Sequence, residues 1–149
     1  MYRSVAIVLL CGLAIPVASA EPVEFADPAN VRQYYAGWMK AASKPYYYRN
    51  YYYKKAPADK EYSYHYAIYY PSRGKKVYMY NPQTKKYWGY WDGENYSLLP
   101  QDKQKASIDD IAAEDFPKPG KAPTIPDIDD AVIIIPPPND FPKIGDDKP

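Results

Sequence analysis

The alternation of apolar and polar positions is clearest between Tyr62 and Pro100. From Tyr62 to Tyr70 every second residue is aromatic or aliphatic, which is the two-residue period of a strand that presents one face to a core. Turn-forming residues interrupt the apolar runs at 71–74, at 81–84 and at Asp92-Gly93. The pattern therefore predicts an antiparallel β-meander of three to four strands, at 62–70, 77–80, 87–91 and 96–99.

A different period precedes the meander. Apolar residues recur there at three- and four-residue spacing, namely Val31, Tyr34 or Tyr35, Trp38, and Ala41 or Ala42. This spacing is typical of an amphipathic helix. Asp27-Pro28 is a helix-start signal, and Pro45 would stop the helix. We predict one short helix over about 28–42 that packs across one face of the meander.

Two tyrosine triplets, at 46–48 and 51–53, separate the predicted helix from the meander. They are compatible with a tight hairpin around Arg49-Asn50 or with an extended linker. Consecutive tyrosines place rings on both faces of any strand. A strand here would therefore need a cover on both faces, and an exposed cationic segment is the alternative.

The composition changes near Pro100. All tyrosines after residue 20 lie between Tyr34 and Tyr96, whereas nine of the seventeen prolines follow residue 105. Residues 21–105 contain 14 basic and 8 acidic residues, and residues 106–149 contain 4 basic and 10 acidic ones. We predict a Pro/Asp-rich acidic tail that is largely disordered, and that either folds back over the basic body electrostatically or keeps the protein soluble.

The tail contains a weak duplication. An Ile-Asp-Asp triplet precedes an Asp-Phe-Pro-Lys segment twice, first at 108–110 and 115–118 and then at 128–130 and 140–143. Between the two parts of the second copy lies the β-branched run Val132–Ile135, which would favour pairing with a sheet edge. The proline triplet 136–138 follows, and it could dock on an aromatic groove of the same molecule.

The first twenty residues have the features of a signal peptide. Arg3 precedes an apolar stretch at 5–15 that is too short to span a bilayer, and Ala18-Ser19-Ala20 forms a small-residue cleavage site. We therefore expect a secreted protein, extracellular or periplasmic, that has no membrane segment after cleavage. The expected organisation is a signal peptide at 1–20, the helix and tyrosine-rich linker at 21–58, the aromatic meander at 59–105 and the tail at 106–149.

This organisation predicts a mainly β fold of the small α+β kind. The expected mature chain also lacks most of the side-chain arrangements that catalysis requires. Cleavage would remove Cys11, the only cysteine, and leave His65 as the single histidine. No serine lies in a nucleophile-elbow context, and no glycine loop or acidic run has phosphate- or calcium-binding spacing. We predict that the protein is not an enzyme and uses neither a metal nor a cofactor.

The tyrosine-rich surface is the main candidate for function. A tyrosine offers a flat apolar ring and a hydroxyl, which suits sugar rings and polyproline segments. Lysines interleave with the rings, an arrangement compatible with anionic cell-wall polymers. Nucleic acid is not an expected partner of an exported protein.

The stretch Gly74–Thr84, followed by Trp88, resembles the second and third strands of a WW domain. It departs from that family in having Tyr66 at the first tryptophan position, Pro82 after Asn81, and Trp88 one residue early. The resemblance implies a three-stranded meander whose aromatic groove, formed by Tyr78 or Tyr80 with Trp88, binds proline-rich peptides. The chain from residue 21 also resembles small tyrosine-rich exported bacterial proteins.

Together these features predict a secreted, non-enzymatic protein that binds cell-envelope glycans or proline-rich peptides. The predicted ligand-binding residues are Tyr78, Tyr80, Trp88 and Tyr90. The alternative is a self-assembling extracellular structural protein, with the tyrosine triplets and Val132–Ile135 as its adhesive elements.

Overall fold

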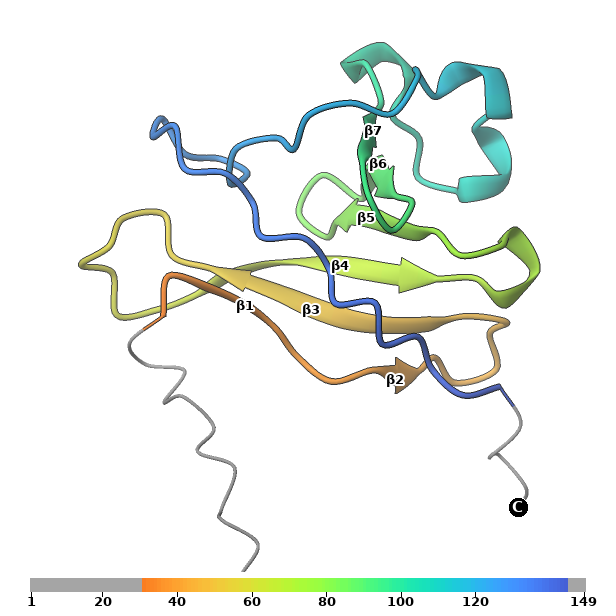
Figure 1. The fold of residues 1–149 in the computed structure, drawn as a ribbon, viewed down its shortest axis with the longest axis horizontal. Coiled ribbons are helices and arrows are strands. Elements are labelled where there is room, and N and C mark those ends of the chain that lie inside the picture. The colour runs from red at the N-terminus through yellow and green to blue at the C-terminus, as the bar shows by residue number, and fades with distance from the viewer. Residues whose placement is uncertain (1–30, 145–149) are drawn as a thin grey trace, which may run out of the picture.

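The computed structural model describes residues 31–144, which form a seven-stranded antiparallel sheet (Figure 1). Six strands follow the order β1-β3-β4-β5-β6-β7, and β2 pairs with β3 beside β1. Within this part of the chain there are no α-helices, and the only helical elements are short 3₁₀ turns. The strands are β1 (Gln33–Tyr35), β2 (Met39–Lys40), β3 (Tyr47–Tyr53), β4 (Ser63–Tyr69), β5 (Val77–Asn81), β6 (Lys86–Trp91) and β7 (Tyr96–Leu98).

The predicted mainly β fold and its antiparallel meander are confirmed. Strands β4 to β7 follow one another in the sheet as they do in the chain. The turn at 71–74 contains a 3₁₀ turn, Pro71–Arg73, which ends at Gly74 with a positive φ of 74°. Gly93 likewise has a φ of 106° in the β6–β7 turn, a conformation that glycine adopts at little cost.

The predicted helix over 28–42 is wrong for the residues that the structure describes. Strands β1 and β2 occupy this stretch and pair with the same edge of β3. The amide of Ala36 donates to the carbonyl of Asn50 over 2.9 Å, so the chain stays close to β3 between the two short strands. The break between β1 and β2 interrupts the two-residue alternation of this edge. The apolar residues therefore recur at three- and four-residue spacing, as they would in a helix. The expected helix start at Asp27-Pro28 lies outside the described residues.

The two tyrosine triplets belong to one strand, so neither the hairpin around Arg49-Asn50 nor the linker is present. In β3, Arg49 pairs with Ala67 and Asn50 with Tyr66, in the middle of a seven-residue register with β4. This strand adds a fifth member to the meander and places tyrosines on both faces of the sheet. A cover for both faces is therefore required.

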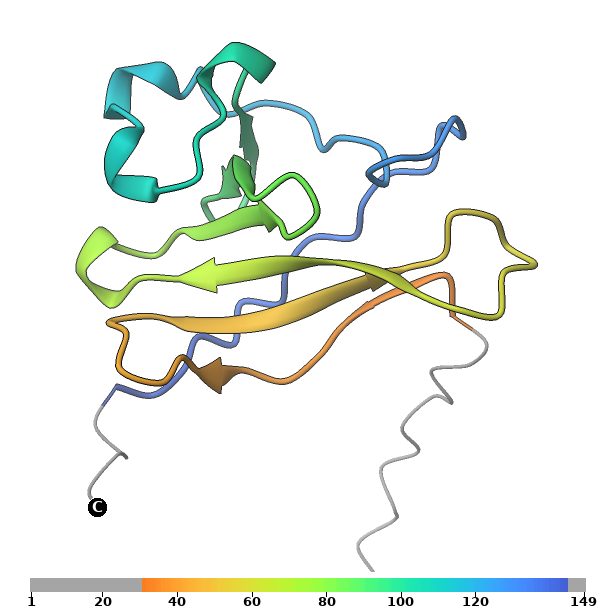
Figure 2. The same ribbon diagram turned by 180° about the vertical axis from the view of Figure 1, so that it is seen from behind.

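One face, which we call the tail-covered face, bears Tyr51, Tyr53, Ala67, Met79 and Trp91 in a single hydrophobic cluster. The tail completes this cluster with Ile125 and Ile134, each only 1% exposed. In Figure 1 the tail crosses in front of β4 and β3, and in Figure 2 it passes behind them. At 25 cal/mol per Å² of apolar surface, each buried isoleucine contributes about 2–3 kcal/mol.

The tail is therefore not largely disordered over residues 106–144, although it forms no named strand or α-helix. It makes only isolated bridges, Tyr96 with Gly120 and Thr124 with Ile133. Its first part folds into the 3₁₀ turns Ile108–Asp110 and Ala113–Asp115. Side-chain packing, not a regular hydrogen-bond ladder, holds it in place.

The two copies of Asp-Phe-Pro-Lys lie on opposite faces of the sheet. Phe116 packs on the rings of Tyr78 and Tyr90, with centroid distances of 6.2 and 4.9 Å. Phe141 packs on Tyr69 of the tail-covered face at 4.9 Å. The weak duplication thus has a structural meaning, because each copy places one phenylalanine on one side of the sheet.

Charge complementarity accompanies this packing. Four ion pairs within residues 31–144 join a lysine or arginine at or before Lys103 to an aspartate of the tail, and they are Arg32–Asp130, Arg49–Asp140, Arg73–Asp109 and Lys103–Asp115. The Arg49 side chain is only 2% exposed, and its guanidinium carbon lies 4.0 Å from the centre of the Trp38 ring. Of the two predicted roles of the acidic tail, folding back over the basic body is the one that the structure shows.

Candidate functional site

The opposite side of the sheet, which we call the tyrosine face, is only partly covered. It bears Tyr52, Tyr64 and Tyr66 near its middle. The turns at 108–116 cover its β5–β6 part, where Ile108 and Ile111 join a second cluster with Tyr78 and Tyr90. Over β3 and β4 no described segment crosses it. Figure 2 looks onto this side of the sheet, with the tail behind β3 and β4.

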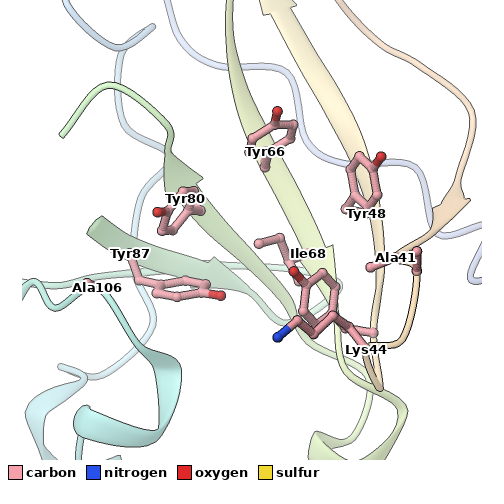
Figure 3. A pocket seen from close by; sticks show the side chains of 10 residues that line it. Ala41, Lys44, Tyr48, Tyr66, Ile68, Tyr80, Tyr87 and Ala106 are labelled. Atoms are coloured by element: carbon pink, nitrogen blue, oxygen red, sulfur yellow. The ribbon is translucent and has the colours of Figure 1, made fainter. Parts of the chain in front are cut away.

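An open pocket of about 510 Å³ lies on the tyrosine face (Figure 3). Strands β3, β4, β5 and β6 supply four of its rings, Tyr48, Tyr66, Tyr80 and Tyr87, around Ile68. The remaining lining comes from loops and consists of Ala41, Ala42, Lys44, Tyr46 and Ala106. Tyrosine side chains therefore dominate the wall.

Ring contacts hold this wall in a fixed shape. Tyr48 meets Tyr66 edge-on at 5.6 Å, and Tyr66 stacks near-parallel to Tyr80 at 6.4 Å. Tyr80 in turn meets Tyr87 at 4.9 Å. Contacts of this kind contribute about 0.5–1.5 kcal/mol beyond the area that they bury. The pocket is thus lined by rings that hold one another in place before any ligand arrives.

The electrostatics of the pocket are simple. Lys44 is the only charged side chain in its lining, and no carboxylate takes part. Burial, and then the hydrogen bond with Tyr64, raises the pKa of Tyr66 above the ordinary tyrosine value, and burial likewise raises the pKa of Tyr87. These hydroxyls therefore stay protonated at neutral pH, and each can both donate and accept a hydrogen bond. The site can offer stacking and neutral hydrogen bonds, but it contains no acid–base pair.

The four predicted ligand-binding residues do not form one surface. Only Tyr80 lines this pocket. Tyr78 and Tyr90 share its face, but they are 5% and 8% exposed beneath Phe116. Trp88 lies on the tail-covered face, where its indole N–H donates to Nδ1 of His65 over 3.0 Å.

A β-bulge explains the position of Trp88. Met79 pairs with Gly89 but the next residue, Tyr80, pairs with Tyr87, so Trp88 is the extra residue of β6. Simple alternation from Tyr90 would place Trp88 on the tyrosine face, and the bulge reverses this. A groove formed by Trp88 together with Tyr78 or Tyr80 is therefore absent from the described sheet.

Sequence reasoning missed Tyr46, Tyr48 and Lys44 as members of the site. Tyr66 was detectable, because the alternation from Tyr62 to Tyr70 places it on the same face as Ile68. Tyr48 can be assigned to the site only once the β3–β4 register is known, because in that register it pairs with Ile68. Nothing in the tyrosine triplets indicates that register.

A second polar cluster surrounds His65, which is 3% exposed on the tail-covered face. Because Nδ1 accepts from Trp88, the proton of the neutral ring is on Nε2, which lies 3.7 Å from Oδ2 of Asp127. The Tyr53 hydroxyl donates to the same oxygen over 3.1 Å. Burial lowers the pKa of His65 to about 4 in spite of the opposing effect of Asp127. The cluster joins β3 and β4 to the tail beside an open pocket of about 450 Å³.

Residues 31–144 contain no group of three or more histidine, cysteine, aspartate or glutamate side chains placed to hold a metal ion. No helix in this range has the length and apolar character needed to cross a bilayer. Comparison with protein-family models, curated proteins and solved structures found no match to this chain.

Proposed function

We propose that this protein is a secreted, non-enzymatic binding protein that holds sugar rings of cell-envelope glycans in the pocket of its tyrosine face. One observation carries the proposal. The tail covers one side of the sheet and the turns at 108–116 cover part of the other, yet the rings of Tyr48, Tyr66 and Tyr80 are only partly buried. A sugar ring has an apolar C–H face and a polar rim, which match a tyrosine ring and its hydroxyl.

The lining supports a neutral or weakly anionic glycan. Several rings in one pocket allow a sugar to be held by faces and hydroxyls together, and Lys44 is available for a carboxylate or phosphate at the rim. The rings already contact one another, so little side-chain entropy is lost on binding. An open pocket suits a segment of a polymer better than a buried small molecule.

Titration of the protein with soluble cell-wall glycan fragments, followed by intrinsic fluorescence and calorimetry, tests the proposal. Tyr48→Leu keeps apolar volume but removes a ring, and we expect about tenfold weaker binding, since 1.4 kcal/mol corresponds to a factor of ten. Tyr34→Leu is the matched control, because Tyr34 pairs with Tyr52 of the same face and its ring contacts Tyr52 and Tyr62, neither of which lines the pocket. Equal affinity of the Tyr48→Leu variant and the original protein, or no binding of any glycan, would refute the proposal.

A proline-rich peptide is the second candidate ligand, favoured by how the protein holds its own tail. The Tyr35 hydroxyl donates to the carbonyl of Ile135 over 3.0 Å, and the Trp38 indole N–H donates to the carbonyl of Asp140 over 2.7 Å. Between these two contacts Pro137 is buried. Aromatic donors directed at carbonyls suit a chain rich in proline, which lacks amide hydrogens.

The same titration with a synthetic proline-rich peptide separates the two ligands. If glycan and peptide compete for the original protein, and the Tyr48→Leu variant binds both of them more weakly, then both ligands occupy the pocket. A peptide that binds equally well to Tyr48→Leu is held elsewhere, and it would rule out the pocket as the peptide site.

Self-assembly remains the alternative function. Its two predicted adhesive elements are largely used within the fold, since Ile134 is 1% exposed and Tyr51 and Tyr53 are fully buried. Ile133, which is 52% exposed, is the accessible member of the β-branched run. Sedimentation at rising concentration tests this alternative, and a constant monomer would exclude it.

A further inference from the structure

Tyr64 is the most exposed tyrosine between residues 31 and 144, with 38% of its surface accessible. It lies near the start of β4, on the tyrosine face but outside the pocket. The other tyrosines of the described chain are half-buried or buried. A reagent or a second protein molecule therefore reaches the Tyr64 ring more readily than any other phenol in this part of the sheet.

Tyr64 also belongs to a series of rings in contact. Its ring centre is 6.0 Å from that of Tyr52 and 5.6 Å from that of Tyr66. The series continues from Tyr52 to Tyr34 at 5.0 Å and from Tyr66 to Tyr80 at 6.4 Å. Rings this close exchange electrons readily, so an oxidised phenol anywhere in the series can take an electron from its neighbour. Tyr64 is the most exposed ring of this series, so it is the ring at which a radical formed in the series can meet a second molecule.

Competing electron donors are remote from this series. The only cysteine of the chain is Cys11, which lies in the predicted signal peptide. Trp88 and Trp91 belong to the cluster of the tail-covered face, and Trp38 lies beneath Arg49 on that same side. The sheet therefore separates the tryptophans from the exposed tyrosines, and an oxidation that begins on the tyrosine face stays among phenols.

We propose that Tyr64 is a site of oxidative tyrosine–tyrosine cross-linking between two copies of this protein, driven by a haem peroxidase with hydrogen peroxide. Each of the two Tyr64 phenols loses one electron and its hydroxyl proton. The two phenoxyl radicals join through a carbon–carbon bond between ring positions next to the oxygens, and the ring hydrogens at those carbons return to the oxygens. The two electrons and two protons reduce one peroxide molecule to two waters.

The cross-link is between molecules because the neighbouring rings within one molecule are poorly placed to couple. Tyr64 meets Tyr66 at an interplanar angle of 65° and Tyr52 at 57°. Tyr64 and Tyr66 are fixed at next-but-one positions of β4, and Tyr64 and Tyr52 are fixed by the pairing of β4 with β3. Both pairs of rings are therefore held steeply inclined, which keeps the coupling carbons from facing each other. A Tyr64 ring of a second molecule has no such restraint. The inference does not depend on glycan or peptide binding, since Tyr64 is outside the pocket.

Exposure of the full chain to horseradish peroxidase and hydrogen peroxide tests the proposal. We expect a covalent dimer with dityrosine fluorescence, and peptide mapping by mass spectrometry should place the bond between two copies of Tyr64. Tyr64→Phe retains the ring and the strand but cannot form a phenoxyl radical, so its dimer yield should fall to that of a sample without peroxide.

Tyr69→Phe is the matched control, because Tyr69 lies on the same strand but is only 6% exposed. Its dimer yield should equal that of the original protein, and circular dichroism should show the same fold for all three proteins. An unchanged dimer yield in Tyr64→Phe would overturn the proposal. A bond mapped to another tyrosine, or formed within one molecule, would overturn it equally.

Discussion

At the scale of single residues, Gly89 shows how one position can decide the shape of the sheet. It follows the bulge residue Trp88 and pairs with Leu98 of β7. A Cβ atom at Gly89 would lie 2.4 Å from the carbonyl oxygen of Ser97. That oxygen belongs to the backbone of the neighbouring strand, so it can move only if β7 moves. The bulge and the close approach of β7 therefore require a glycine here.

Gly89→Ala should lower the free energy of unfolding by about 2–3 kcal/mol, which is the usual cost of overpacking a buried site. Gly37→Ala is the control, since no atom lies within 4 Å of the equivalent Cβ, and its effect should stay within about 0.5 kcal/mol. Urea unfolding followed by circular dichroism measures both values. Equal stability of the two variants would contradict the account of the bulge.

His65 is the second residue whose surroundings have a measurable consequence. Its buried neutral ring accepts from Trp88, and protonation would place two N–H donors opposite each other. Because burial lowers the pKa of His65 to about 4, the unfolded chain, with an ordinary histidine pKa near 6.5, binds this proton at a higher pH than the folded protein does. The contribution of His65 is therefore full above about pH 6.5 and decreases as the pH falls towards 4.

Over that window the loss should be on the order of 3 kcal/mol, since each pH unit corresponds to about 1.36 kcal/mol. His65→Asn retains an acceptor for the Trp88 N–H near the position of Nδ1 but does not titrate. Urea unfolding at several pH values between 4 and 7 should therefore show a much flatter dependence for this variant. Parallel pH profiles for the two proteins would refute the assignment.

At the scale of elements, the sequence predicts those parts of the fold in which neighbours along the chain are also neighbours in space. The two-residue period from Tyr62 to Tyr70 and the turn residues that follow it correctly predict β4 to β7. The edge strands were missed because their pairing partner, β3, is separated from them by a loop and sets their conformation through tertiary contacts. The spacing of Val31, Trp38 and Ala41 does not indicate that this stretch pairs with β3.

The tail escaped prediction for a different reason. Its buried residues Ile108, Ile111, Ile125 and Ile134 follow no period, because the segment forms no regular secondary structure. A composition rich in proline and aspartate is typical of disorder. The opposite charges of body and tail, the β-branched run Val132–Ile135 and the proline triplet 136–138 indicated docking, but none of them indicated which isoleucines would be buried. The candidate site was predicted in its chemistry, since tyrosine rings form it, but not in its membership, because the bulge redirects Trp88 and Phe116 covers Tyr78 and Tyr90.

Ile134→Ala tests the order of the tail. Ile134 is 1% exposed within the cluster of the tail-covered face, so its truncation should lower the free energy of unfolding by about 2–4 kcal/mol. Ile133→Ala, the adjacent isoleucine with 52% exposure, should change it by less than about 1 kcal/mol. Urea unfolding of the two variants provides the comparison. A tail that contributes nothing to folding would give two variants of equal stability.

At the scale of the whole molecule, phenols take the place that aliphatic side chains occupy in most cores. Burial is the leading cause that raises the pKa of Tyr35, Tyr51, Tyr53 and Tyr96 on the tail-covered face. The folded protein therefore keeps protons on these hydroxyls at a pH at which the unfolded chain releases them. Stability that depends on these groups is complete below about pH 10 and is lost as the pH rises above it.

We expect an ultraviolet titration of the full chain to show that the phenols of Tyr35, Tyr51, Tyr53 and Tyr96 ionise late. Because burial raises their pKa values, they should ionise only together with unfolding, at a pH above the ordinary tyrosine value near 10. Circular dichroism recorded on the same samples should lose its β signal as these phenols ionise. A single ionisation near pH 10 with an intact β signal would contradict the buried positions of these phenols.

The tail contacts have a consequence for the order in which the molecule assembles. Arg32 meets Asp130, Gln33 meets Ile133 and Trp38 meets Asp140, across sequence separations of 98, 100 and 102 residues. The first strand of the sheet therefore remains without these partners until nearly the whole described chain is present. Contacts across such separations require the closure of long loops, which slows folding. When the chain is synthesised from its N-terminus, the tail-covered face stays exposed to solvent until the tail has been made. Partially synthesised chains are therefore the species most at risk of aggregation.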